Sequence, residues 1–393
     1  MTSQPRSADA VRLSSVLSLF AIGLMLRPQI VGIGPLQARM QSSLGISHAV
    51  AGLVVTIPVL CMGMFAPFAS RLQRRYGRSA TSTALLLIGI AGVVRAVVPG
   101  AALVLLVTVP IGIGIALAGT LLPVLVKEEY VNAPTLGTGV YATGINVGAT
   151  IAALTAAALA AAIGWRGVLA VYSAVSIVLV LPWVFGRRQV AEPLEPARLP
   201  VRSPVAWAIV ATFALQSVLF YGLNAWLADA YVERGWSQGS AGALVAVANA
   251  VSLVTGIVAA LGAHRFTSRR IFLVSAAVLS LLATTFFALD LPSAWVWAAA
   301  AGASFGILFT TVMVLPLDAG ATRGEVAAVT SLMLGVGYVF SALAPLLLGA
   351  VRDATGSFKA PLALLAVDAF VLLVVSTALS PRRVKALGGF ASQ

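Results

Sequence analysis

Arg27 is the residue of this sequence whose type and position point most directly to chemistry. It lies near the middle of an apolar run over residues 13–36, directly after Leu24, Met25 and Leu26. A cation at the centre of a bilayer costs at least ~2.5–3.5 kcal/mol, so we expect the side chain to face an internal cavity. Its guanidinium stays charged and offers a planar fork of donors, which suits a carboxylate. The alternative is a structural arginine satisfied by helix-end carbonyls or by an internal acid.

Neutral polar and aromatic residues in other apolar runs are candidates for the same site. Amides and phenols at this depth need hydrogen-bond partners, which a polar ligand or cavity water can supply. The candidates for substrate binding beside Arg27 are Asn146, Gln216, Tyr221, Asn224, Asn249 and Tyr338. Tyr141, Thr310 and Thr311 are weaker candidates, and threonine often bonds to its own helix. The alternative for each amide is a hydrogen bond between helices, which is common in membranes.

Two further charged residues lie within apolar runs. Arg95 lies shortly before Pro99, so we expect its side chain to reach the membrane interface by snorkelling. Asp368 lies within the run 364–374, where burial favours the neutral acid and the residue could carry a transported proton. A hydrogen-bonded structural aspartate is the alternative for Asp368.

The composition is that of a membrane protein. Of the 393 residues, 60% are hydrophobic and 9% are charged, and the mean hydropathy is +1.01. Soluble domains carry about 25% charged residues. The net charge of +13 does not indicate nucleic-acid binding, because the basic residues lie between apolar runs. With one cysteine, two histidines and no Walker motif, we expect no metal, no cofactor and no internal disulfide.

Twelve apolar runs are long enough to cross a bilayer, which takes about 20 residues. They cover residues 13–36, 49–71, 79–98, 101–125, 135–163, 167–186, 205–229, 239–262, 270–289, 292–317, 325–350 and 359–380. A polar stretch over 186–203 separates the first six from the last six. The sequence therefore predicts an all-α polytopic membrane protein of twelve transmembrane helices. Its expected parts are an N-terminal six-helix bundle (1–186), a cytoplasmic linker (187–204) and a C-terminal six-helix bundle (205–393).

Basic residues predict the orientation. With the N-terminus in the cytoplasm, eighteen of the 25 lysines and arginines lie in cytoplasmic segments, five lie on the opposite side and two lie within runs. This bias follows the positive-inside rule. The abundance of arginine over lysine, and of alanine, favours a bacterial source. We therefore expect a multi-pass protein of the bacterial inner membrane with both termini in the cytoplasm.

The two halves repeat at an offset of 190 residues, with no gap needed across about 30 residues. The offset aligns Gly45-Ile46-Ser47 with Gly235-Trp236-Ser237, Ala51-Gly52 with Ala241-Gly242, and Arg74-Arg75-Tyr76 with His264-Arg265-Phe266. Parallel six-helix repeats are typical of transporters whose site lies between the halves. Arg27 aligns with Ser217, so we expect an asymmetric site in two pseudo-symmetric bundles.

This organisation resembles the major facilitator superfamily. Between its second and third helices that family has roughly Gly-x-x-x-Asp-Arg-x-Gly-Arg-Arg, and Arg75, Gly77 and Arg78 match the pattern. Ser70 and Arg74 replace its glycine and aspartate. Two stretches are similar to the cyanate and nitroimidazole porter family: Leu26-Arg27-Pro28 with Gly32-Ile33-Gly34-Pro35, and Gly337-Tyr338 with Ala344-Pro345, Gly349, Asp353, Thr355 and Gly356. The resemblance implies a small anionic or polar nitrogenous solute, such as a cyanate-like anion or a nitroimidazole-like compound, which the guanidinium of Arg27 would bind.

Opposite charges near the expected cytoplasmic helix ends could form a gate. These gating candidates are Arg74, Arg75, Glu128, Glu129, Arg265 and Asp318. Exposed ion pairs are worth only ~0–1 kcal/mol each, which is enough to bias two nearly balanced conformers. A solvated interfacial face is the alternative.

We therefore expect a non-enzymatic secondary transporter, active or facilitative, that works by alternating access. Its expected partners are a small-molecule substrate, possible coupling protons and the lipid bilayer, and we expect a monomer. A multidrug or nitro-drug efflux antiporter is one alternative, and it should tolerate Arg27→Ala for neutral drugs. A membrane-embedded sensor that binds ligand without moving it is another. An intramembrane enzyme is disfavoured, because no nucleophile–base pair occurs in the runs.

Overall fold

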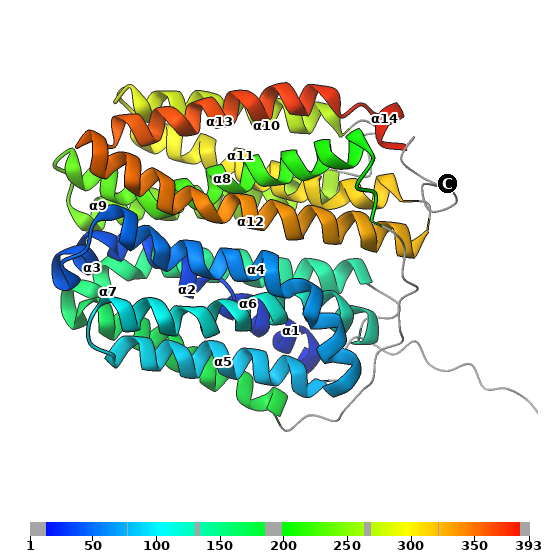
Figure 1. The fold of residues 1–393 in the computed structure, drawn as a ribbon, viewed down its shortest axis with the longest axis horizontal. Helices are drawn as coiled ribbons and strands as arrows, with labels where there is room; N and C mark the ends of the chain where they lie inside the picture. Colours follow the sequence, from blue (N-terminus) through cyan, green and yellow to red (C-terminus); the bar gives the residue numbers. More distant parts are fainter. Residues whose placement is uncertain are drawn as a thin grey trace, which may run out of the picture.

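A computed structural model describes residues 13–76, 78–129, 134–184, 199–262, 269–320 and 322–385 (Figure 1). This part of the chain consists of helices and connections, with no strand. The first half contains α1 (Leu13–Met25), α2 (Pro28–Val31), η1 (Gly34–Leu36), α3 (Gln37–Leu44), α4 (His48–Tyr76), α5 (Arg78–Val97), α6 (Ala101–Glu129) and α7 (Pro134–Val184). The second half contains α8 (Pro204–Glu233), α9 (Gln238–Gly262), α10 (Arg270–Ala288), α11 (Ala294–Ala319), α12 (Arg323–Thr355), α13 (Lys359–Ala378) and α14 (Pro381–Lys385).

The described helices confirm the predicted spans. Eleven segments are long and apolar enough to cross a membrane, and one of them, Gly139–Leu181, is twice the usual length. That segment bends back at Gly164, whose φ of 70° and ψ of 166° interrupt α7. The Tyr172 hydroxyl lies 3.0 Å from the Ala152 carbonyl oxygen, although twenty residues of straight helix would span about 30 Å. α7 is therefore two antiparallel spans, which brings the count to twelve.

The first span is broken rather than continuous. α1 ends at Met25, and α2 begins at Pro28 with Arg27 as its N-cap residue. Proline lacks the amide hydrogen of a helix interior and clashes with the preceding turn, which explains the break. Pro35 lies at the start of η1 and gives the second irregularity. The break places Arg27 where one helical segment ends and the next begins.

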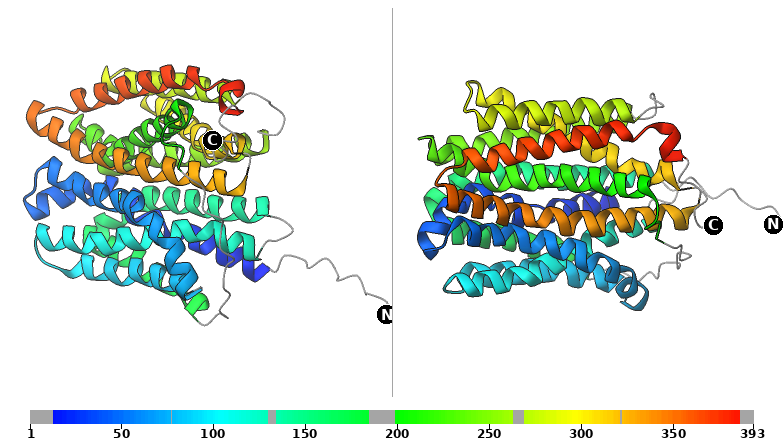
Figure 2. Two further views of the ribbon diagram at one scale, coloured as in Figure 1. Left: turned by 45° about the vertical axis from the view of Figure 1, so that its right-hand side comes forward. Right: turned by 45° about the horizontal axis from the view of Figure 1, so that its top comes forward.

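The two halves of the chain form two bundles that pack side by side (Figures 1 and 2). Across the boundary α4 packs against α12, and α7 packs against α9. The start of α1 and the whole of α14 lie at one end of the molecule, which we call the proximal end. The connections from α3 to α4, α8 to α9 and α12 to α13 lie at the other end, which we call the distal end.

The bundles are in close contact in the distal half. η1 and α3 pack against α8 of the opposite bundle, whereas α1 packs mainly against α7 of its own bundle. A Cβ atom at Gly34 would collide with the carbonyl oxygen of Asn224, and one at Gly52 would collide with that of Pro345. Backbone-to-backbone contact of this kind needs glycine, as at other interfaces of membrane helices. The structure is therefore a conformer that is closed at its distal end.

Candidate substrate-binding site

Arg27 reaches across the boundary between the bundles. Its Nη1 donates a hydrogen bond of 2.9 Å to the hydroxyl of Tyr221, which lies in the middle of α8. The break of the first helix positions the arginine, and the continuous α8 positions the tyrosine. One residue from each half of the chain thus meets between the two bundles.

Aromatic rings surround the guanidinium on the α8 side. The Arg27 Cζ atom lies 5.1 Å from the centroid of Phe220 and 5.6 Å from that of Tyr221, within range of cation–π attraction. Tyr338 of α12 lies 6.4 Å from Tyr221, centroid to centroid, and 5.0 Å from Phe213. These rings can hold a planar or delocalised group beside the cation.

Arg27 keeps donors that are open to a ligand. A guanidinium has five N–H donors. In the described part of the chain, Arg27 donates a hydrogen bond from one nitrogen, Nη1, and the acceptor is Tyr221. The residue is partly exposed, and neither of its remaining nitrogens is buried without a partner. No acid among the described residues forms an ion pair with it. The arginine is therefore oriented by the opposite bundle but not neutralised.

The other predicted binding residues are placed in three different ways. Tyr221 and Tyr338 join Arg27, and Tyr141 lies within electrostatic range of Tyr338. Asn249 donates a 2.8 Å hydrogen bond to the side chain of Asn224, inside the second bundle.

The last two amides bond to groups close to them in the sequence. Asn146 donates to the Ala142 carbonyl, and Gln216 donates to the Ser217 hydroxyl. Thr310 and Thr311 lie on α11 beside α9, where Thr310 donates to the carbonyl of Gly256.

The expectation for Arg95 is wrong. The residue is 0% exposed, and its guanidinium donates to the side-chain oxygen of Gln29. Gln29 in turn donates to the hydroxyl of Ser173 over 2.9 Å. The polar chain from α5 through α2 to α7 offers a partner within the first bundle, so the side chain has no need to reach the interface. Unlike Arg27, Arg95 has no surface at which a ligand could meet it.

Arg95→Lys should therefore lower stability and leave ligand affinity unchanged. Lysine carries the charge, but its side chain is shorter and would not reach Gln29 as Nη2 of Arg95 does, and a lost hydrogen bond to a charged group costs about 1.5–3 kcal/mol of unfolding free energy. The measurement is thermal unfolding of the purified variant, together with its affinity for any ligand that stabilises the wild type. A variant with normal stability and weakened binding would contradict this structural role.

The predicted gating and proton-carrying residues are only partly described. The side chains of Arg74, Arg75, Glu128 and Glu129, and all of Arg265, lie outside the described residues, as does most of the predicted linker. Asp318 pairs with Arg269 at 3.1 Å, within the second bundle. Asp368 lies on α13, and its Oδ2 is buried without a hydrogen-bond partner among the described residues. These roles remain predictions.

Comparison with known proteins identifies the family. The sequence model of the Major Facilitator Superfamily matches residues 13–345, which is most of the chain. The chain belongs to the Major Facilitator Superfamily. It is a multi-pass membrane transporter, and the predicted resemblance is confirmed.

Curated relatives of this superfamily member are named as transporters. The cyanate transport protein CynX of Escherichia coli (strain K12) is 28% identical over 375 residues, which cover 94% of this chain and 97% of that protein. A 2-nitroimidazole transporter of the same organism is 26% identical over 371 residues, covering 92% and 94%. Both matches span nearly the whole length of both proteins.

Solved structures share the fold of the superfamily. An inward-facing, unoccupied bacterial homologue of the human lysosomal transporter Spinster gives a TM-score of 0.75 at 19% identity, covering 97% of this chain and 98% of that one. A mutant of the nucleoside transporter NupG gives 0.76 at 13% identity, covering 93% and 99%. The predicted fold of twelve helices in two six-helix bundles is confirmed.

Several residues around the site were not singled out by sequence. Phe220 stacks toward Arg27, and Met62 of α4 lies 4.0 Å from the Tyr221 hydroxyl. Phe220 had a signal, because it directly precedes Tyr221 in the same apolar run. No sequence feature pointed to Met62, because a methionine of a membrane helix that faces the site looks the same in the sequence as one that faces lipid.

Proposed function

We propose that this transporter carries a small anionic or polar nitrogenous solute by alternating access, with Arg27, Tyr221 and Tyr338 as its binding group. The observation that supports this most is the state of Arg27. Its guanidinium lies between the two bundles, is held by one cross-bundle hydrogen bond and keeps further donors accessible. A solute that engages both Arg27 and the α8 tyrosine would link its own binding to the relative position of the bundles.

The chemistry of the site favours solutes with a compact electronegative group. A carboxylate or a nitro group can accept two parallel hydrogen bonds from a guanidinium, and a linear cyanate-like anion can accept hydrogen bonds at one terminal atom. The rings of Phe220 and Tyr338 add flat walls that suit a delocalised or heteroaromatic body. The names of two relatives, a cyanate transport protein and a 2-nitroimidazole transporter, agree with this solute class.

The proposed setting is the bacterial inner membrane with both termini in the cytoplasm. The positive-inside bias of the sequence supports this orientation, and the distal end then faces the outside. We further propose residues 1–186 and 205–393 as the two moving bundles of a monomer, joined by the linker 187–204. The structure then corresponds to the conformer in which the outer path to Arg27 is closed.

A ligand screen followed by a flux measurement tests the proposal. Purified protein is heated with cyanate, small carboxylates and 2-nitroimidazole, and with a neutral sugar as the control. We expect a rise in unfolding temperature with at least one member of the first group and none with the sugar. The stabilising compound should then accumulate in proteoliposomes containing the protein.

Two outcomes would favour the alternatives. Stabilisation by several unrelated neutral drugs, with expulsion unaffected by Arg27→Ala, would indicate a multidrug exporter. Binding that never leads to flux in reconstituted protein would indicate a sensor. Either result would contradict the proposed role of Arg27 in solute transport.

A further inference from the structure

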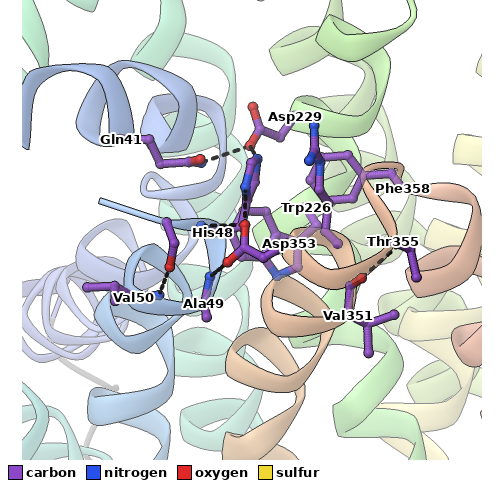
Figure 3. A network of polar contacts seen from close by, with 12 residues as sticks. Gln41, His48, Ala49, Val50, Trp226, Asp229, Val351, Asp353, Thr355 and Phe358 are labelled. Atoms are coloured by element: carbon purple, nitrogen blue, oxygen red, sulfur yellow. Dashed lines mark hydrogen bonds and ion pairs between the residues drawn. The ribbon is translucent and has the colours of Figure 1, made fainter. Parts of the chain in front are cut away.

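A polar cluster joins the two bundles at the distal end (Figure 3). Gln41 of α3 and His48 of α4 belong to the first bundle, and Asp229 of α8 and Asp353 of α12 belong to the second. We call these four residues the distal latch. The histidine lies between the two carboxylates, which approach it from different helices of the opposite bundle.

Asp353 caps the first turn of α4 from across the boundary. Its carboxylate accepts the backbone N–H groups of His48 at 3.1 Å and Ala49 at 2.9 Å. Its Oδ1 also lies 2.7 Å from Nδ1 of the His48 ring. A carboxylate at a helix N-terminus satisfies unpaired amides and interacts favourably with the helix dipole. The cap is lost whenever the bundles separate at this end, because its two halves lie on different bundles.

Asp229 makes the second connection. Its Oδ2 accepts a 3.0 Å hydrogen bond from Nε2 of Gln41 and lies 3.8 Å from Nε2 of His48. The aspartate side chain is 7% exposed, and that of the histidine is 20% exposed. Trp226 and Phe358 flank the imidazole at 5.6 and 5.5 Å between ring centroids. These two rings lie 5.6 Å from each other, so both cover the imidazole from the same side, while a carboxylate lies within 4 Å of each of its nitrogens.

The surrounding charges leave His48 as the group that balances these carboxylates. Arg352 of α12 also lies nearby, but it pairs with Glu233 of α8 at 2.9 Å, so those two charges largely offset each other. A protonated imidazole can donate from Nδ1 to Asp353 over 2.7 Å and places its second N–H 3.8 Å from Asp229, within ion-pair distance. A neutral imidazole donates from one nitrogen only and directs a lone pair from the other toward an oxygen. The closed geometry therefore fits the protonated ring.

The internal repeat relates two contacts between the bundles at the distal end, and one of the two contains a histidine. The offset of 190 residues relates Arg39 to Asp229 and His48 to Gln238. Arg39 donates to the side chain of Gln238, and so forms the symmetry-related counterpart of the contact between His48 and Asp229. An arginine–glutamine contact does not change between pH 5 and 8, whereas histidine ordinarily titrates in this range.

We propose that the distal latch is a proton-binding site, and that a proton on His48 holds the distal end of the transporter closed. This inference rests on the proposed alternating access. In the closed conformer Asp229 and Asp353 face the imidazole from the opposite bundle, and opening would move them away, so a positive charge on the ring favours closure. By linkage, acid raises the closed population and a rise in pH lowers it. Because His48 lies at the distal surface, the proton exchanges with that side and acts as a regulator of closure.

The test measures the distance between the bundles without any solute. Spin labels are attached at Ala102→Cys, in α6, and at Leu291→Cys, after α10, in a Cys61→Ala background. Both positions are exposed and lie at the distal end of opposite bundles. Double electron–electron resonance at pH 5 and pH 8.5 should show about a fivefold rise in the ratio of long to short distances at the higher pH, the effect of one partly exposed ion pair.

Three variants complete the test. His48→Gln cannot be charged and His48→Lys stays charged, so both should lose the pH response, with more open protein in the first and more closed protein in the second. His264→Gln changes the one other histidine of the sequence and should respond like the parent protein. A parent protein without a pH response, or a His48→Gln variant that keeps it, would overturn the proposal. If His48→Gln does not fold, a pH response retained by His48→Lys would overturn it equally. A pH response in a protein that transports nothing would leave the latch standing and contradict the proposed function.

Discussion

Replacing Arg27 with lysine should abolish solute uptake while leaving a folded protein. Lysine keeps the positive charge but presents a single ammonium, so it cannot form the paired hydrogen bonds that a planar anion or nitro group accepts. It also cannot hold the cation–π geometry against Phe220 and the bond to Tyr221 together. A lost charge-assisted hydrogen bond is worth about 1.5–3 kcal/mol, which corresponds to roughly 10- to 150-fold in affinity. The measurement is initial uptake into proteoliposomes at a fixed solute concentration.

Arg95→Lys is the matched control for this experiment. It makes the same substitution in the same bundle, at a guanidinium that is fully buried against Gln29. Its uptake per folded molecule should equal that of the wild type, even though its unfolding temperature falls. Equal uptake by Arg27→Lys and the wild type would remove Arg27 from the binding site. Equal loss in both variants would show that the effect is structural.

Replacing Gly34 with leucine should trap the transporter with its distal end open and stop turnover. Any side chain at Gly34 meets the carbonyl oxygen of Asn224, which belongs to the opposite bundle. The collision therefore raises the free energy of the closed conformer. It does not arise in a conformer in which the bundles have separated there. Overpacking costs about 1–3 kcal/mol, which shifts the balance of conformers by roughly 5- to 150-fold.

Two measurements separate trapping from unfolding. The label pair at Ala102 and Leu291 should report longer distances in Gly34→Leu than in its parent, with a normal elution profile from size-exclusion chromatography. Gly139→Leu is the control, because no atom lies within 4 Å of the site of its Cβ. Gly139→Leu should keep wild-type distances and flux. Wild-type flux in Gly34→Leu would contradict closure between η1 and α8 as part of the transport cycle.

The architecture could be predicted from the sequence because a bilayer imposes a strong length rule. Each span must satisfy its own backbone hydrogen bonds over about 20 apolar residues, so the runs and helices coincide within a few residues. The exception is the first span, where Pro28 lies inside the apolar run and breaks the helix beside Arg27. A hydropathy profile does not reveal such a break, because a single proline does not interrupt the apolar run.

The site could be predicted only in part. A charged residue inside a span has few acceptable environments, which is why Arg27 and the tyrosines of α8 and α12 could be proposed from sequence. Arg95 shows the limit of this reasoning, since its partner Gln29 lies 66 residues away and only the packing of α2 and α5 on α7 brings them together. The distal latch shows the same limit, because His48 and Asp353 are 305 residues apart. Their pairing depends on how the two bundles meet.

The role of Arg27 as the anchor of the solute between the bundles can be tested most directly by equilibrium binding. Isothermal titration calorimetry would compare the dissociation constant of the best stabilising solute for the wild type, Arg27→Lys and Arg95→Lys. We predict binding weakened by at least about tenfold in Arg27→Lys and unchanged in Arg95→Lys. Wild-type affinity in a folded Arg27→Lys protein would contradict the account.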